Sequence, residues 1–354
     1  MICKIFNDFF YSHMKLAISI IGFILNILCI VGFSNAKFKN NNTKSSNQLN
    51  VFKYLLIKSY CDAYLLAHNV LFQFLFMFFN DYFYMYHSIC LFRILFEEFF
   101  DFIAELVSMF CDIAASFNRY RTITNKFKCF DRISFVFKVI LIFLYAFGFY
   151  SYKFFQYSCV PNKLNSSATA ATTFSNRTLN YEENYSTKYK VLTFIHSVVR
   201  DGVCILIILI VNLLTMRFVM KKIQLKRELR NSSQMRTNDT RESKAENNVT
   251  NLVLVSGFIT VFGHILFIVY HLPFDSLHQN ECLNMISSIL FYFSYAFNFF
   301  IYYMYNFLFR NYFRTLFCKF IKCITFNRIV LGVYDDETNN LYNPVMINNN
   351  NNRE

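Results

Sequence analysis

Seven stretches of this chain are apolar over lengths that match the thickness of a lipid bilayer. A helix needs roughly 20 apolar residues to cross about 30 Å of hydrocarbon. The candidate segments are 16–34, 54–79, 89–117, 136–158, 189–219, 249–272 and 283–306. None of them alternates polar and apolar residues, and a backbone in lipid must satisfy its polar groups within the segment. The pattern therefore predicts an all-α integral membrane protein, a bundle of seven transmembrane helices.

The polar stretches around these segments predict four parts of the chain. They are a short extracellular N-terminus (1–15), the seven-helix domain (16–306), a membrane-surface helix (307–326) and a disordered cytosolic tail (327–354). The first segment is too long for a signal peptide and lacks a clear cleavage site, so we expect it to be retained. The stretch 221–248 is charged and is predicted to be a mobile cytosolic loop.

The predicted surface helix carries aromatic residues on one face and basic residues largely on the other. Phe309 and Phe313 represent the first set and Arg310 the second. Cys318 and Cys323 follow and are candidates for palmitoylation at the inner membrane surface. The alternative is an untethered basic tail.

Positive charge sets the expected orientation. Most of the 35 Lys and Arg residues follow the first, third, fifth and seventh segments. Basic residues are enriched on the cytosolic side, so the N-terminus is expected outside and the C-terminus in the cytosol. The composition, 55% hydrophobic and 16% charged, excludes a soluble domain. The net charge of +13 then reflects this asymmetry and attraction to anionic inner-leaflet lipid, with no indication of nucleic acid.

The long outer stretch 159–188 is polar and carries three glycosylation sequons, at Asn165, Asn176 and Asn184. Four cysteines face the expected oxidising side: Cys3, Cys90, Cys159 and Cys282. A disulfide between Cys90 and Cys159 would pin the outer stretch over the bundle, and a Cys3–Cys282 bridge is the weaker second possibility. The connectivity stays open.

Polar residues inside the apolar segments carry functional information, because their burial in lipid is costly. Asn26, Asp62, Ser108, Ser294 and Asn298 each lie near the middle of a segment. A carboxylate that is surrounded by hydroxyls and amides at this depth could hold a cation, commonly Na⁺, or be protonated instead.

Arg119 ends the third segment within the run Asn118-Arg119-Tyr120. A fixed cation at this position can snorkel to lipid headgroups or hold neighbouring helices together.

Together these motifs resemble those of the rhodopsin-like (class A) G protein-coupled receptors, over essentially all seven segments. Asn118-Arg119-Tyr120 is similar to the family's Asp-Arg-Tyr, and Asn298-Phe299-Phe300-Ile301-Tyr302 to its Asn-Pro-x-x-Tyr. Asp62 and Ser108 lie at the spacing from Arg119 that the family's sodium site uses. The resemblance implies a plasma-membrane receptor that binds an extracellular ligand and activates a heterotrimeric G protein, without enzymatic activity.

The same resemblance assigns roles to individual residues. The expected activation switch consists of Asn118, Arg119, Tyr120, Asn298 and Tyr302, and the expected Na⁺ site of Asp62, Ser108, Ser294 and Asn298.

Several departures from the family pattern indicate a divergent, invertebrate-type receptor. Asn118 replaces the acid that normally pairs with the arginine, which predicts raised basal activity. Phe299 replaces the proline of the seventh segment, and this change is expected to remove a kink. By spacing, His264 takes the place of the proline in the sixth segment, with Phe262 where a toggling Trp would lie. Cys90 is about one helical turn farther from Arg119 than the family pattern places it.

A stripe of carboxylates on the third segment, Glu98, Asp101, Glu105 and Asp112, recurs at helical spacing. One interpretation is an outer pocket for a cationic amine or peptide, with Asp101, Glu105 and Glu98 joined by Tyr292 and Phe262. The alternative is internal pairing of these acids with Lys58, Arg93 and Arg200.

Other functions fit the sequence less well. A zinc hydrolase would need converging ligands, and no His-x-x-x-His occurs in a segment. A membrane transporter or channel would show inverted repeats or helices broken by Gly and Pro, and the chain has only 7 Gly and 3 Pro. A chemosensory receptor for environmental small molecules remains an alternative within the receptor class.

Overall fold

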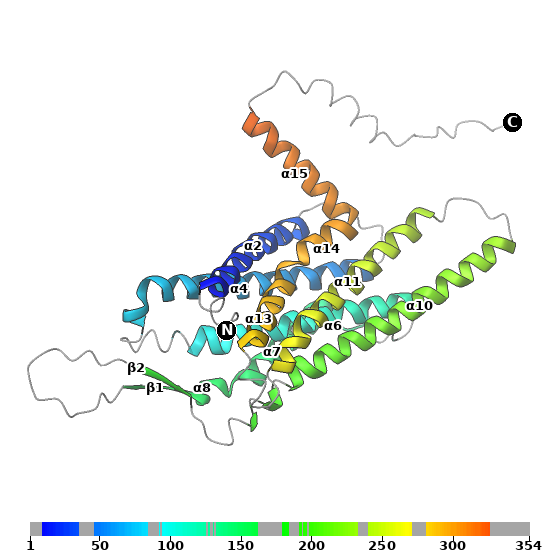
Figure 1. The fold of residues 1–354 in the computed structure, drawn as a ribbon. Helices are drawn as coiled ribbons and strands as arrows, with labels where there is room; N and C mark the ends of the chain where they lie inside the picture. Colours follow the sequence, from blue (N-terminus) through cyan, green and yellow to red (C-terminus); the bar gives the residue numbers. More distant parts are fainter. Residues whose placement is uncertain are drawn as a thin grey trace, which may run out of the picture. The chain divides into compact units, whose positions relative to one another are not determined.

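The described parts of the chain are predominantly helical (Figure 1). The computed structural model describes residues 9–34, 46–83, 92, 94–124, 127, 130, 132–161, 179–183, 191–192, 194–196, 198–232, 240–270 and 281–325. The elements along the first five predicted segments are α2 (Phe9–Ser34), α4 (Ser46–Phe83), the π-helical η1 (Ile94–Phe100), α6 (Asp101–Thr124), α7 (Phe135–Tyr150), α8 (Lys153–Gln156), β1 (Tyr157–Pro161), β2 (Leu179–Glu183), the π-helical η3 (Val198–Val203) and α10 (Cys204–Ser232). They are followed by α11 (Thr240–Tyr270), α13 (Glu281–Ala296), α14 (Asn298–Tyr305) and α15 (Phe307–Thr325).

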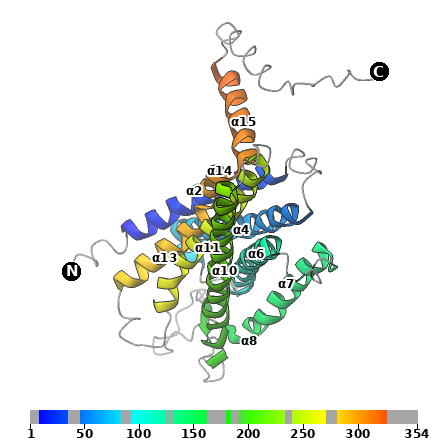
Figure 2. The same ribbon diagram turned by 90° about the vertical axis from the view of Figure 1, so that its right-hand side faces the viewer.

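The chain divides into two compact units, Met1–Phe307 and Leu308–Glu354. Within the first unit, α6 contacts α4, α7, α10 and α11, while α2 packs on α4 and α13 (Figure 2). More than half of the α6 side chains are buried, and these include Glu105, Asp112 and Arg119. Helix α6 is therefore the central helix of this unit, and its polar residues lie inside it.

Within the described residues, three helical stretches are long and apolar enough to cross a membrane: His13–Ser34, Phe194–Leu225 and Asn248–Tyr270. The pair Cys282–Ala296 and Asn298–Tyr305 makes a fourth if it forms one bent span. These four coincide with the first, fifth, sixth and seventh predicted segments. Helix α7 is apolar but has 16 residues. Helices α4 and α6, of 38 and 24 residues, are long enough at 1.5 Å per residue, but they carry several charged residues.

Helices α13 and α14 meet at Phe297 with a bend of 41°. The expectation that loss of the proline at Phe299 would remove a kink is therefore wrong. Kinks also arise where a side chain inserts into the backbone hydrogen-bond ladder. Here the carbonyl oxygen of Tyr295 accepts hydrogen bonds from Nδ2 of Asn26, at 3.0 Å, and from Nδ2 of Asn298, at 3.3 Å. Two asparagine amides, rather than a proline, accompany this break.

Other local features depart from the sequence prediction. Strands β1 and β2, which the apolar segments did not predict, pair antiparallel with Cys159 opposite Tyr181, beside an otherwise helical fold. Helix α10 continues to Ser232 and α11 begins at Thr240. Much of the stretch 221–248, predicted to be a mobile loop, is therefore helical.

The unit that follows Phe307 contains α15, whose bounds are close to those predicted for the surface helix, 307–326. The rings of Phe309 and Phe313, one helical turn apart, pack at 4.7 Å. Arg314 and Cys318 are exposed, and Cys318 is a free cysteine.

Candidate functional site

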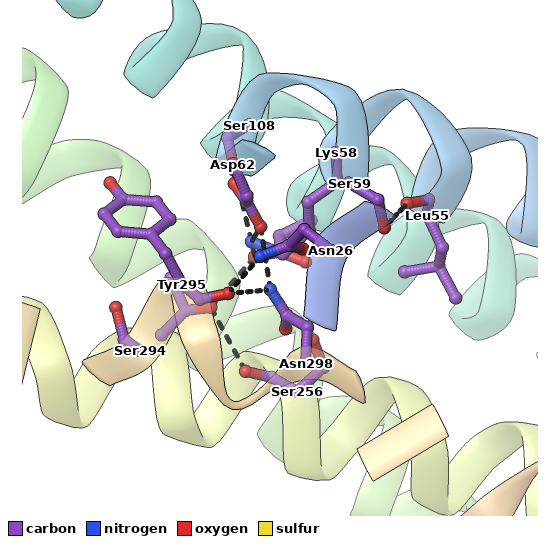
Figure 3. Close-up of polar contacts among 12 residues, drawn as sticks. Asn26, Leu55, Lys58, Ser59, Asp62, Ser108, Ser256, Ser294, Tyr295 and Asn298 are labelled. Carbon is purple, nitrogen blue, oxygen red and sulfur yellow. Dashed lines mark hydrogen bonds and ion pairs between the residues drawn. The ribbon is translucent and has the colours of Figure 1, made fainter. Parts of the chain in front are cut away.

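The centre of the first unit contains a buried ion cluster built on α4 and α6 (Figure 3). Lys58 and Asp62 lie one turn apart on α4, with 3.5 Å between Lys58 Nζ and Asp62 Oδ2. Lys58 Nζ also lies 2.9 Å from Asp112 Oδ2 and donates to Ser108 Oγ at 3.2 Å. All four residues are at most 3% exposed. Buried charges are tolerated when they are paired and hydrogen-bonded, as these are.

Hydrogen bonds extend this cluster to two more helices. Asn298 Nδ2, on α14, donates to Asp62 Oδ2 at 2.7 Å, and Ser108 Oγ donates to Asp62 Oδ1 at 2.6 Å. Thr260 Oγ1, on α11, donates to Asp112 Oδ2 at 2.9 Å. One polar network thus joins α4, α6, α11 and α14, so a movement of any of these helices would disturb it.

Three of the four residues expected to form a sodium site are brought together: Asp62, Ser108 and Asn298. The hydroxyl of the fourth, Ser294, instead donates to the carbonyl oxygen of Phe291 on its own helix, at 2.7 Å. Figure 3 shows Ser294 apart from the carboxylate of Asp62. The sequence did not assign Lys58 to this group, although its i, i+4 spacing from Asp62 was visible.

A second set of polar contacts engages the outer carboxylates of the acidic stripe. Glu105 Oε2 lies 3.0 Å from Arg200 Nη1, and Arg200 also pairs with Asp201 at 2.6 Å. Asp101 Oδ2 lies 2.7 Å from His68 Nδ1. Asp112 and Glu105 thus pair with Lys58 and Arg200, two of the three cations that the pairing alternative named. Asp101 instead contacts His68, and Arg93 lies outside the described residues. The side chain of Glu98 lies outside the described residues.

The aromatic residues proposed for the pocket lie in different surroundings. The ring of Tyr292, on α13, lies 4.6 Å from Lys15 Nζ. Phe262 is 63% exposed on α11, whereas His264, two residues later, is fully buried. The His264 Nε2 atom lies 3.1 Å from the hydroxyl of Tyr295. Of these two α11 residues, His264 faces the interior and Phe262 does not.

At the other end of α6, Arg119 is 1% exposed, and its Nε donates to Thr250 Oγ1 of α11 at 2.7 Å. Asn118 Oδ1 accepts a hydrogen bond from Arg121 Nη2 at 2.6 Å. The ring of Tyr120 packs edge-on against Phe218 of α10, at 5.7 Å. The guanidinium of Arg119 is thus enclosed by protein and bonded to a neighbouring helix, which does not fit simple snorkelling.

Tyr302, the last residue of the expected switch, is fully buried on α14. Its ring packs edge-on against Phe33 of α2 at 4.9 Å.

Several predicted modification residues lie outside the described parts of the chain. These are Cys90, Asn165, Asn176 and Asn184, together with the side chains of Cys159 and Cys323. Cys282, at the start of α13, is disulfide-bonded, and its partner is not among the cysteines whose side chains are described.

No protein-family model and no curated protein sequence matches this chain.

Proposed function

We propose that the chain is a G protein-coupled receptor of the plasma membrane, with its N-terminus outside and its C-terminus in the cytosol. The observation that carries this proposal is the buried Arg119–Thr250 hydrogen bond between α6 and α11. A cation that serves only as a lipid anchor needs no buried partner on a second helix. A bond of this kind holds two helices in one arrangement, and its release permits another.

The distribution of polarity supports a membrane location with seven spans. Lys58, Asp62 and Arg119 are buried, whereas α7 exposes apolar side chains such as Val136 and Leu144, each 64% exposed. Charged residues inside and apolar residues outside suit lipid as the solvent. In the proposed topology α4, α6 and α7 cross the membrane together with the four described stretches that are long and apolar enough to span it, the bent pair being counted as one.

The proposed mechanism is a two-state equilibrium. In the closed state α6 and α11 are joined at two levels, by Arg119–Thr250 and by Asp112–Thr260. A ligand that binds the open state more tightly shifts the population toward it. Separation of α11 from α6 would then expose Arg119 and Tyr120 to a heterotrimeric G protein at the cytosolic face.

The ligand contact that we favour is Asp101. Its side chain is 26% exposed, compared with 6% for Glu105, and it contacts His68, whereas Glu105 is held by the buried Arg200. A cationic amine or peptide can displace a histidine from a carboxylate at lower cost than it can break the buried pair between Glu105 and Arg200. Environmental small molecules and non-cationic peptides are the other ligand classes for the same pocket.

The proposal is tested by replacing Arg119 with alanine and measuring G protein activation in cells against a panel of G protein α subunits. We expect loss of coupling with surface expression retained. Arg217→Ala, which removes an exposed arginine from α10, serves as the matched control. Full coupling by the Arg119 variant at equal surface expression would contradict the receptor mechanism.

A further inference from the structure

The ammonium group of Lys58 lies among the oxygens of Asp62 and Ser108, two residues of the expected sodium site, and of Asp112. It lies 2.9 Å from a carboxylate oxygen of Asp112, 3.5 Å from one of Asp62 and 3.2 Å from the hydroxyl of Ser108. These are oxygen atoms of the kind that a hard cation would take as ligands. A covalently attached cation therefore already lies where a bound ion was expected.

Carboxylate oxygens of this cluster also accept hydrogen bonds from other side chains. Both oxygens of Asp62 accept hydrogen bonds, from Ser108 and from Asn298. The Asp112 oxygen that faces Lys58 also accepts a hydrogen bond from Thr260. A sodium ion would have to displace the ammonium of Lys58, which is buried at 2% exposure. The residues present therefore do not fit a sodium ion beside Lys58.

We propose that Lys58 acts as a built-in cation in place of a bound sodium ion, so that the core of this chain neither binds nor responds to sodium. The lysine lies one helical turn from Asp62 on the same helix, so it is held near its partner whatever the salt concentration. A dissociable ion leaves when its site is deformed, whereas this cation stays. The inference concerns the ion content of the core and does not depend on the receptor function.

Thermal unfolding of the purified full-length protein in lipid nanodiscs tests this inference. The midpoint is measured in sodium chloride and in choline chloride of equal concentration, because choline is too large for the cluster. The wild type is expected to unfold at the same temperature in both salts. Lys58→Met leaves two carboxylates and their donors without a cation, so its midpoint is expected to be higher in sodium chloride. A gain on the order of 3 °C corresponds to sodium at roughly ten times its dissociation constant.

Lys53→Met is the matched control. Lys53 lies on the same helix, 5.1 Å from the ring of Phe135, and pairs with none of the cluster carboxylates in the contacts described above. It is expected to show no difference between the two salts. If Lys58→Met does not fold, Lys58→Met/Asp112→Asn is measured instead, since it retains the net charge of the native cluster, and the same sodium response is expected.

Two results would overturn the inference. One is a saturable stabilisation of the wild type by sodium over choline. The other is the absence of any sodium response in the folded Lys58 variant, single or double. Because the readout is stability, either result leaves the test of G protein coupling unaffected.

Discussion

The hydrogen bond between Arg119 and Thr250 allows a quantitative prediction for Thr250→Val. Valine has nearly the shape of threonine but cannot accept a hydrogen bond. In the native protein Arg119 Nε donates to Thr250 Oγ1 at 2.7 Å. A hydrogen bond to a charged group contributes about 1.5–3 kcal/mol. If the bond exists only in the closed state, its loss shifts the equilibrium toward the open state roughly 10- to 150-fold. A receptor that is open about 1% of the time would then be open roughly 9% to 60% of the time.

Ligand-independent nucleotide exchange on the G protein is the appropriate assay, in membranes with equal amounts of surface receptor. We expect higher basal exchange for Thr250→Val than for the wild type and a lower unfolding temperature. Thr215→Val is the matched control, because Thr215 is also 1% exposed but its hydroxyl donates to Val211 within α10. It should lose a comparable hydroxyl without a change in basal exchange.

Basal nucleotide exchange and the unfolding temperature of Thr250→Val report on different properties of the Arg119–Thr250 bond. Reduced stability with unchanged basal exchange would mean that the Arg119–Thr250 bond persists in the active state. Unchanged stability and unchanged exchange would mean that the bond contributes nothing, and the proposed mechanism would lose its main support.

Three further substitutions give sharp expectations. Asn118→Asp places an ionised acceptor where Arg121 Nη2 now donates to Asn118 Oδ1 at 2.6 Å, next to Arg119 in the sequence. It should lower basal exchange about five-fold, since a charged hydrogen bond is stronger by about 1 kcal/mol; equal basal exchange would refute the expectation that Asn118 raises basal activity. Gly22→Ala would put its Cβ 2.6 Å from the Ala296 side chain and should lower the unfolding free energy by about 1–3 kcal/mol, whereas Gly148→Ala, with nothing within 4 Å, should not. In a screen of biogenic amines and basic peptides, Asp101→Asn should abolish responses to cationic agonists, and a set of uncharged agonists indifferent to it would contradict the cationic pocket.

The sequence predicted the helices well because their signal is local. The membrane-capable stretches His13–Ser34, Phe194–Leu225 and Asn248–Tyr270 overlap closely with the predicted segments 16–34, 189–219 and 249–272. Other features depend on contacts between distant residues. The bend at Phe297 accompanies an amide from Asn26, on another helix, and no local breaker marks its position.

The residues of the candidate site could be predicted only in part, because some of its contacts join residues that are distant in the sequence. Asp62, Ser108 and Asn298 were identified as polar residues at membrane depth, and the structure brings them together. Whether the nearby Lys58 would face lipid, a headgroup or these carboxylates depends on the rotation of α4, which sequence periodicity alone does not determine. Pairing of the acidic stripe with lysine and arginine was one of two interpretations left open, and the ion pairs agree with it.

The buried charges of α4 and α6 also bear on how the protein would enter a bilayer. On the scale derived from cellular insertion, a charged residue at the centre of a helix costs about 2.5–3.5 kcal/mol. The charge of Asp112 on α6 is paired with Lys58 of α4, so its insertion cost is not compensated within α6 alone. On α4, Lys58 and Asp62 compensate each other only in part, since Lys58 lies closer to Asp112 than to Asp62. In the proposed topology α4 would therefore be retained at the translocon until α6 is synthesised, and the two helices would partition into lipid as a pair. The ion cluster would then act first as an assembly signal during biosynthesis.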